Sequence, residues 1–395
     1  MFMFALFEQS SEHLQTMFDS EEEFDSIIAK GPNEVVGKFM KELPTDLRDG
    51  AAPLSNFTKV GFLARGSFGR VYHVTAPDET PMALKKLSLQ QSNNHCHEIV
   101  LKDSLREVKM LASLKHHNIA KLHQIVVGIS DVFLAIEFCP VQLANVVKYK
   151  APERIVKSLT WQLMTGLSYI HSRGLIHRDI KTDNLMLKAG VLKIADFGST
   201  AGVKQAKWTP QVVTLWYRPP EILLGCARQT CAVDVWSAGC VISELLKGKP
   251  LFPGQSEINQ INHIVDLLGT PTENDWPDLN SLSVMTCMAL NERERQFEDE
   301  FARITSDAGV KLLSGMLVYD PAKRLSSSDS LHQTYFTEQP SMATENEVAQ
   351  YCEQLKRVQK QRVLYDDSDD NSENSNQDDN GRRLGCGRVK KKLKL

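Results

Sequence analysis

One short stretch of the chain constrains its fold and chemistry more than any other. It reads HRDIKTDN over residues 177–184 and is followed by DFG at residues 196–198. Transfer of a γ-phosphoryl group depends on an oriented hydroxyl nucleophile and on neutralised phosphate charge, with little covalent help from the protein. Asp179 can accept the hydroxyl proton, and Lys181 can offer a point charge to the phosphate. Asn184 and Asp196 supply hard oxygen ligands for Mg²⁺, so the pattern predicts a phosphoryl-transfer site that uses ATP and Mg²⁺.

Length and charge distribution divide the chain into three parts. With 395 residues, 42% of them hydrophobic, the chain is long enough for more than one domain with a substantial core. Acidic residues dominate positions 1–55, and the end of the chain splits into an acidic run at 366–380 and a basic run at 382–394. We therefore predict an acidic N-terminal extension over 1–55, a folded domain over 56–336 and a largely disordered tail over 337–395.

The cysteines and the apolar start of the chain argue against two protein classes. The eight cysteines are scattered without a paired CxxC spacing, so neither a zinc site nor a disulfide framework is predicted, and a reducing compartment is expected. Residues 1–7 are apolar but lack a basic start and are too short to cross a bilayer, so no membrane association is expected. Residues 8–30 mix acids with apolar side chains, which fits either amphipathic helices that dock on a partner or a solvated leader.

Hydrophobic periodicity predicts a sheet-rich part followed by a helical part. Strands are expected at 57–63, 71–75, 81–87, 125–128 and 132–137, and one long helix at 98–114. Helices are expected at 155–170, 232–247, 257–268 and 308–318, with the last folded residue near Phe336. The predicted fold class is α+β, with a small antiparallel sheet and one long helix over 56–139 and a mostly helical part over 140–336.

A glycine-containing turn between two predicted strands suits a nucleotide. In this turn Gly66 and Gly69 allow backbone amides to approach phosphates. Ala64 stands where the nucleotide-loop pattern opens with a glycine, and taken alone the motif would suit an ordinary β-turn better. Its place between two strands favours the nucleotide. The predicted ATP-binding positions are Leu63, Ala64, Arg65, Gly66, Ser67, Phe68, Gly69, Arg70 and Val71.

A lysine on the next strand requires an acidic partner. The sequence Met-Ala-Leu-Lys at 82–85 puts Lys85 toward the α and β phosphates of a nucleotide. Glu107 lies on the long predicted helix and can hold Lys85 through an ion pair. A helical glutamate is usually a solvated surface residue, but the order of the motifs along the chain favours the pair.

The second half of the chain carries further motifs that are specific as a set. They read TPQVVTLWYRPPE at 209–221, DVWS at 234–237, LFPG at 251–254, LGTP at 268–271 and DPAKR at 320–324. With these motifs, residues 57–336 resemble the cyclin-dependent kinase family of serine/threonine protein kinases. The SLRE sequence at 104–107 is similar to the PITSLRE and PISSLRE branch, which is linked to cell-cycle and transcription or splicing control. The resemblance implies a bilobal protein kinase fold, with an N-lobe at 56–139 and a C-lobe at 140–336.

The resemblance also implies roles for residues around the catalytic stretch. It makes Asp179, Lys181 and Thr214 the catalytic residues, with Thr214 in contact with the other two, and it pairs Glu221 with Arg324. Further ATP-binding positions implied by the resemblance are Ala83, Lys85, Glu107, Glu137, Cys139 and Met186. Gln142 takes the place of the usual ribose-binding Asp, and it can still accept a hydrogen bond without the charge.

Regulation is implied at four positions. The resemblance makes Thr209 a phosphorylation site, and its phosphate would be held by arginines because guanidinium groups bind such a dianion bidentately. Arg106 and Arg178 are present, but Ala201 stands where the third arginine is expected, so dependence on Thr209 is open and an unmodified hydroxyl is the alternative. Ser67 is a further candidate, because a phosphate there would repel those of ATP.

The implied partners are a cyclin-like activating subunit, which would press the 98–114 helix inward, and protein substrates. Val212, Val213 and Arg218 resemble the surface that leaves room for a proline after the phosphoacceptor, which implies a Ser/Thr-Pro preference. The basic tail at 382–394 fits a nuclear-import signal or nucleic-acid patch, or a solvated terminus; nucleic-acid binding is not expected elsewhere. We expect the protein in nucleus and cytoplasm.

The competing hypothesis is a catalytically weak, kinase-like scaffold or regulatory binding protein. It is motivated by the departures from the family pattern at Ala64, Gln142 and Ala201. The groups that argue against it are Lys85, Glu107, Asp179, Asn184 and Asp196.

Overall fold

The computed structural model describes residues 33–66, 69–87, 89, 97–203, 214–226, 229–282 and 291–358. The chain divides into two units, Met1–Gln350 and Tyr351–Leu395, and the second is described only over residues 351–358, which are helical. The amphipathic segment predicted at 8–30 and the charged runs predicted at 366–380 and 382–394 lie outside the described residues.

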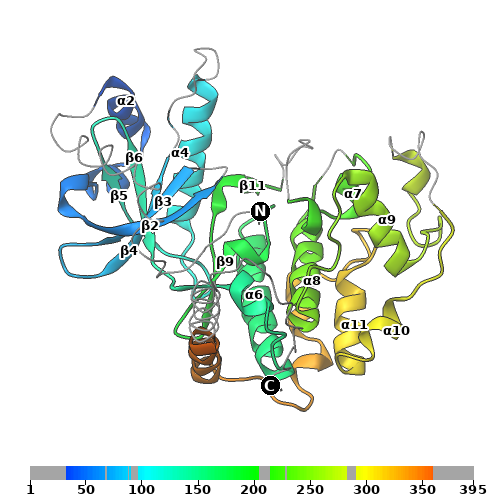
Figure 1. Cartoon of the computed structure of the whole chain (residues 1–395). Coiled ribbons are helices and arrows are strands. Elements are labelled where there is room, and N and C mark those ends of the chain that lie inside the picture. The colour runs from blue at the N-terminus through cyan, green and yellow to red at the C-terminus, as the bar shows by residue number, and fades with distance from the viewer. Residues whose placement is uncertain are drawn as a thin grey trace, which may run out of the picture. The chain divides into compact units, whose positions relative to one another are not determined.

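The first half of the larger unit forms a six-stranded sheet with one long helix (Figure 1). In spatial order the strands are β1 (Ala52–Pro53), β5 (Leu122–Val127), β6 (Val132–Glu137), β4 (Pro81–Lys86), β3 (Gly69–Thr75) and β2 (Thr58–Gly66). All neighbours pair antiparallel except β1 and β5, which are parallel. The helix α4 spans His97–Ser113. The predicted α+β class and the predicted sheet-plus-helix arrangement are confirmed.

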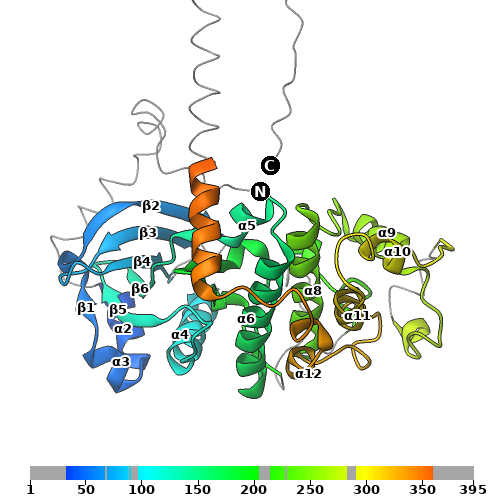
Figure 2. The same ribbon diagram turned by 90° about the horizontal axis from the view of Figure 1, so that it is seen from below.

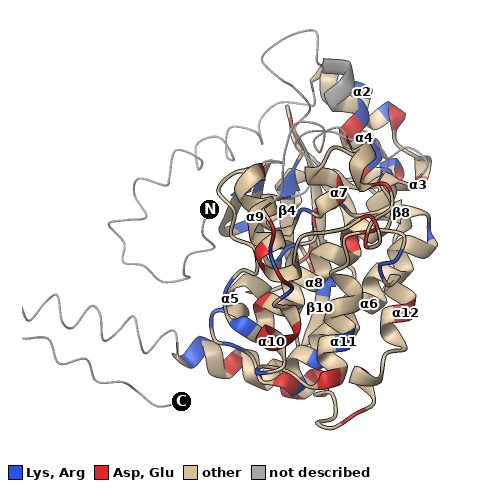
Figure 3. Ribbon diagram, turned by 90° about the vertical axis from the view of Figure 1, so that its right-hand side faces the viewer, with Lys and Arg blue, Asp and Glu red and all other residues tan. Residues whose placement is uncertain are grey.

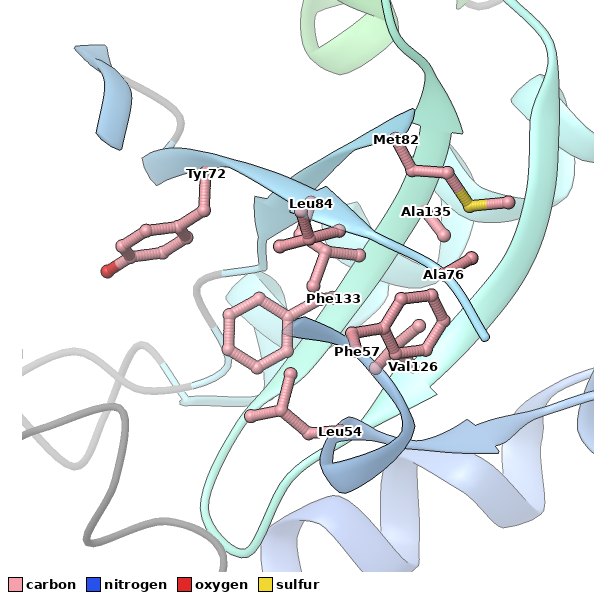
Figure 4. Close-up of a cluster of buried hydrophobic side chains, with 10 residues drawn as sticks. Leu54, Phe57, Tyr72, Ala76, Met82, Leu84, Val126, Phe133 and Ala135 are labelled. Atoms are coloured by element: carbon pink, nitrogen blue, oxygen red, sulfur yellow. The ribbon is translucent and has the colours of Figure 1, made fainter. Parts of the chain in front are cut away.

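Alternation along the strands separates a packed face of the sheet from the face that carries the chemistry. Figure 4 shows the packed cluster, whose buried members are Leu54, Phe57, Tyr72, Val74, Ala76, Met82, Leu84, Val126, Phe133 and Ala135. Met82 and Leu84 of β4 point into this cluster. Because successive side chains of a strand point to opposite faces, Ala83 and Lys85 point to the other one.

Part of the predicted N-terminal extension packs on the sheet. Helix α2 (Glu34–Glu42) begins at Asn33, whose side chain accepts a hydrogen bond from the N–H of Val36 at 3.0 Å. Val36 and Phe39 are completely buried. After α3 (Thr45–Asp49), the chain enters β1 beside β5. The apolar pattern in this stretch covers too few residues to predict a helix from the sequence.

The second half of the unit is mainly helical, as predicted. Its helices are α5 (Leu143–Val147), α6 (Glu153–Ser172), α7 (Pro220–Leu223), α8 (Ala232–Lys247), α9 (Glu257–Leu268), α10 (Phe297–Phe301), α11 (Asp307–Met316) and α12 (Ser327–Leu331). In Figure 2, α6, α8 and α11 lie side by side. Short strands add β7 (Val141–Gln142), β8 (Leu175–Ile176), β9 (Leu185–Lys188), β10 (Val191–Ile194) and β11 (Ala201–Gly202).

The chain stays folded past Phe336, where we expected the last folded residue. Lys157 of α6 is completely buried, and its Nζ donates hydrogen bonds to the carbonyl oxygens of Pro340 at 3.0 Å and Glu338 at 3.3 Å. A buried ammonium group needs such acceptors, so these contacts hold the following segment on the helical part. Val348 is also completely buried. No helix in the described part of the chain is long and apolar enough to span a membrane.

Candidate active site

The lysine of β4 joins two distant carboxylates. Lys85 Nζ lies 2.6 Å from Glu107 Oε1 on α4 and 2.8 Å from Asp196 Oδ1. Burial alone would lower the pKa of Lys85, but the negative charges of Asp196 and Glu107 outweigh it and raise this pKa. The ammonium group is therefore charged, and it ties the sheet, α4 and the segment after β10 together.

The backbone of the HRD segment is held by a buried aspartate of α8. Asp234 accepts hydrogen bonds from the N–H groups of His177 and Arg178, each at 2.8 Å. Arg178 has a φ of 66°, a left-handed conformation that is unfavourable for a side chain of its size. The two hydrogen bonds stabilise this conformation. The sequence assigned no role to Asp234, because its partners lie more than fifty positions away in the chain.

His177 braces the same segment. Its Nε2 lies 3.1 Å from the carbonyl oxygen of Ala195, directly before Asp196. Its ring packs edge-on against Phe197 at 4.9 Å between centroids. Burial lowers the pKa of His177, so the ring is neutral and one ring nitrogen can donate to Ala195. The HRD and DFG segments are thereby fixed to each other.

Three side chains converge on Asp179. Thr214 Oγ1 donates to Asp179 Oδ1 at 3.0 Å, and Lys181 Nζ donates to Oδ2 at 2.8 Å. Lys181 Nζ also lies 3.0 Å from Thr214 Oγ1. Asn184 Nδ2 donates to the carbonyl oxygen of Asp179 at 2.9 Å and to Oδ2 at 2.8 Å. The contacts that the family resemblance implied for Thr214 are both present, and they orient one nearly buried carboxylate.

Asn184 and Asp196 offer oxygen atoms suited to a hard cation. Both N–H bonds of the Asn184 amide are used by Asp179, which leaves the amide oxygen for another partner. Burial alone would raise the pKa of Asp196, but the charge of Lys85 outweighs it, so this pKa is lowered and the carboxylate is ionised. Lys85 donates to Oδ1 of Asp196. This donor set fits Mg²⁺.

The nucleotide-loop positions occupy the β2–β3 hairpin. Leu63, Ala64, Arg65 and Gly66 end β2, and Gly69, Arg70 and Val71 begin β3. Ser67 and Phe68 lie outside the described residues. Gly69 has a φ of 131°, and a Cβ there would lie 2.3 Å from the carbonyl oxygen of Lys86. Only glycine allows β3 to approach β4 this closely, whereas Ala64 pairs with Val71 directly after a register shift that follows Phe62.

Side-chain ion pairs stabilise the connection between the six-stranded sheet and the helical part. Glu137, at the end of β6, has carboxylate oxygens 3.1 Å from Lys188 Nζ and 3.2 Å from Lys193 Nζ, so it joins the sheet to β9 and β10. Cys139 is buried, which raises the pKa of its thiol to about 12. Met186 lies on β9 opposite Gln142.

Gln142 makes a contact within the protein that the sequence did not predict. Its Nε2 donates to the carbonyl oxygen of Asp183 at 2.8 Å, and the side chain is nearly sealed from water. Gln142 therefore supports the catalytic segment through an amide N–H. A carboxylate at this position could not donate that hydrogen bond.

Comparison with known proteins agrees with this arrangement. The protein kinase domain family matches residues 57–336. Cyclin-dependent kinase 10 of Mus musculus is 40% identical over 298 residues, which are 73% of this chain and 81% of that protein. The chain belongs to the cyclin-dependent kinase family. Cyclin-dependent kinase 11B of Mus musculus is 36% identical over 323 residues, which are 79% of this chain but 40% of that protein. The predicted family and branch are confirmed, and the chain is a serine/threonine protein kinase.

The predicted phosphate cradle of this kinase is described in part. Thr209, Val212 and Val213 lie outside the described residues. Arg178 donates through Nε to the carbonyl oxygen of Ser199 at 2.6 Å, while Arg106 is exposed and lies 3.1 Å from Asp103. Burial and the nearby charge of Arg106 lower the pKa of Arg178. Ala201 is buried in β11 opposite Ile176.

The ion pair implied for the helical part of the kinase is present. Arg324 Nη1 and Nη2 lie 2.8 Å and 2.9 Å from the two carboxylate oxygens of Glu221. Arg324 also donates to the carbonyl oxygens of Ala232 and Val318. Such a two-pronged contact fixes α7 against the segment before α12.

Proposed function

We propose that this kinase transfers the γ-phosphoryl group of ATP to a serine or threonine hydroxyl of a protein, with Asp179 accepting the hydroxyl proton. The observation that carries the proposal is the convergence of Lys181, Thr214 and Asn184 on the Asp179 carboxylate, at 2.8 to 3.0 Å. These contacts keep the acceptor oriented, and general bases held in this way contribute about 10² to 10⁴ in rate.

The nucleotide would be held by groups from both parts of the unit. Lys85 binds the α and β phosphates, and the β2–β3 hairpin covers them. Adenine lies against Ala83, Met186 and the backbone at Glu137 and Cys139. Asn184 and Asp196 would hold Mg²⁺, which would supply positive charge to neutralise the phosphates.

Activation would act on α4. A cyclin-like subunit holds α4 so that Glu107 stays on Lys85. The relatives named above are called cyclin-dependent, which supports this partner. Phosphorylation of Thr209 would draw on Arg106 and Arg178, with the third arginine replaced by Ala201. We propose substrates with Ser/Thr-Pro sites in cell-cycle or transcription control, and action in nucleus and cytoplasm.

The test compares phosphate transfer by the wild-type chain with that of Asp179→Asn, each with the activating partner. We expect a loss of about 10³-fold, while nucleotide binding, measured by a fluorescent ATP analogue, is retained. Asp266→Asn on α9, whose carboxylate lies 2.9 Å from Arg293 on the surface, is the control and should transfer phosphate normally. Equal transfer by wild type and Asp179→Asn would support the scaffold hypothesis instead.

A further inference from the structure

An open groove runs along the outer side of α4. Its volume is about 630 Å³, and its lining comes from α4, the end of α2 and the segment between α6 and β8. The groove is separate from the residues assigned to ATP and catalysis, and it shares Arg106 with the predicted phosphate cradle. We therefore consider the groove as a binding site distinct from that of ATP.

The lining of the groove is basic with an apolar floor. Lys102, Arg106 and Lys109 follow one another at spacings of four and three residues, which places them on one face of α4, and Arg173 faces them. All four are exposed, and among the described residues that line the groove Glu42 is the only acid. Leu105, Met110 and Leu175 add apolar surface. Figure 3 colours the charged positions of these elements. The groove suits an acidic segment with apolar side chains.

We propose that residues 8–28 of this same chain dock in the groove. Residues 1–29 contain seven acidic side chains and no lysine or arginine. Apolar side chains are interspersed among these acids, including Leu14, Phe18 and Phe24. The acidic run at 366–380 is a poorer match, because it lacks such apolar side chains and is followed by a basic run that the groove would repel.

The connection to α2 brings the segment within reach. Glu42, at the end of α2, lines the groove, and the nine residues of α2 span about 13 Å. The eight steps from Asp25 to Asn33 span up to about 26 Å when extended, which is more than enough to return along α2. Because the segment is tethered, its effective concentration at the groove is on the order of millimolar, so weak contacts suffice for docking.

Docking has a consequence for α4. The groove includes Leu105 and Arg106, which immediately precede Glu107 on the helix that carries the Lys85 ion pair. A segment lying there shields the face through which a partner would act on α4. This consequence, unlike the docking itself, rests on the proposed function: the cyclin-like subunit has to displace the segment.

The experiment measures hydrogen exchange of the backbone amides of residues 101–113 in the full-length chain. In the variant Glu21→Lys/Glu22→Lys/Glu23→Lys we expect exchange to become at least threefold faster, because the segment leaves the groove. The matched control reverses three acids of the tail, Asp369→Lys/Asp370→Lys/Glu373→Lys, and should exchange like wild type. The readout needs no phosphate transfer, so its outcome is independent of the proposed catalysis.

A charge-swap variant separates docking from damage to α4. Lys102→Glu/Lys109→Glu/Arg173→Glu should also exchange faster, and adding the three N-terminal Glu→Lys changes to it should restore at least half of the lost protection. An unchanged rate in the N-terminal variant, or no recovery in the combined one, overturns the proposal. Faster exchange in the tail variant alone would assign the groove to residues 366–380 and overturn it as well.

Discussion

The ion pair of Lys85 with Glu107 and that of Arg324 with Glu221 are both nearly sealed from water, but they join different kinds of elements. Side-chain exposure is 8% and 10% for the first pair, and 0% and 2% for the second. Lys85 bridges the sheet to α4 and is shared with Asp196, whose side chain is 29% exposed. Arg324 lies wholly within the helical part and is further bound by backbone carbonyls.

We take this difference to separate the ion pair that we propose for catalysis from a structural one. The donors of Arg324 are occupied by protein acceptors, so no group remains for a ligand. The pair of Lys85 stands on α4, on which we propose that an activating partner acts, and Asp196 borders solvent. We therefore expect the loss of Lys85 to affect activity, and the loss of Arg324 to affect folding.

The largest effect is expected for Lys85→Met. Removing the ammonium group takes away a charge directed at phosphate and frees Glu107, so phosphate transfer should fall by about 10³-fold, equivalent to about 4 kcal/mol. The free energy of unfolding should fall by less than about 2 kcal/mol, because Asp196 borders solvent and can be hydrated or protonated. Steady-state kinetics and urea unfolding measure the two effects. Lys86→Met, which removes a partly buried ion pair with Asp131, is the control for activity.

Arg324→Met should affect the free energy of unfolding more strongly than it affects phosphate transfer. It leaves the buried carboxylate of Glu221 without a cation, which costs about 3–5 kcal/mol of unfolding free energy. Combining it with Glu221→Leu removes the stranded charge, so the double variant should be more stable than Arg324→Met alone. Urea unfolding of both variants checks this. A single variant as stable as wild type would contradict the structural role of the pair.

Glu244 is a buried carboxylate that accepts a hydrogen bond from a hydroxyl group rather than pairing with a cation. Its Oε2 accepts from the Tyr217 hydroxyl at 2.7 Å, and burial raises its pKa from 4.5 to about 7. Between these two pH values the unfolded carboxyl is ionised while the folded one stays protonated, so stability falls as pH rises, by up to about 3 kcal/mol.

Glu244→Gln should lack this pH dependence. Its unfolding free energy relative to wild type should therefore increase between pH 4.5 and pH 7 and then level off. Thermal or urea unfolding at several pH values measures the difference. A constant difference across this window would show that Glu244 titrates normally.

The smallest effect is expected for Glu137→Gln. Glu137 holds Lys188 and Lys193, but Lys188 is half exposed, so solvent screens much of the attraction. We expect a loss of about 1 kcal/mol or less, shrinking as salt is added, and unchanged phosphate transfer. Unfolding at low and high salt tests this, and a loss as large as that of Arg324→Met would remove the distinction between the two kinds of ion pair.

Local patterns were enough to predict the strands, the long helix and the groups of the catalytic segment. Lys85, Glu107 and Asp196 stand in short motifs whose order along the chain already implies that they meet. The contacts that hold the surrounding backbone in place were not predictable from the sequence. Asp234, which holds the HRD backbone, and Lys157, which anchors the segment after Phe336, act through backbone groups that are distant in sequence and have no motif of their own.

The sequence by itself determined the family, the sheet-plus-helix architecture and the side chains available for phosphate chemistry, because these depend on residue types at short, regular spacings. Only the tertiary structure decided that Gln142 supports the catalytic segment, that residues 34–54 pack on the sheet, and that basic side chains of α4 and Arg173 face one groove. Such contacts depend on which surfaces meet after folding. Burial and hydrogen-bond partners there are set by the whole chain rather than by neighbours in sequence.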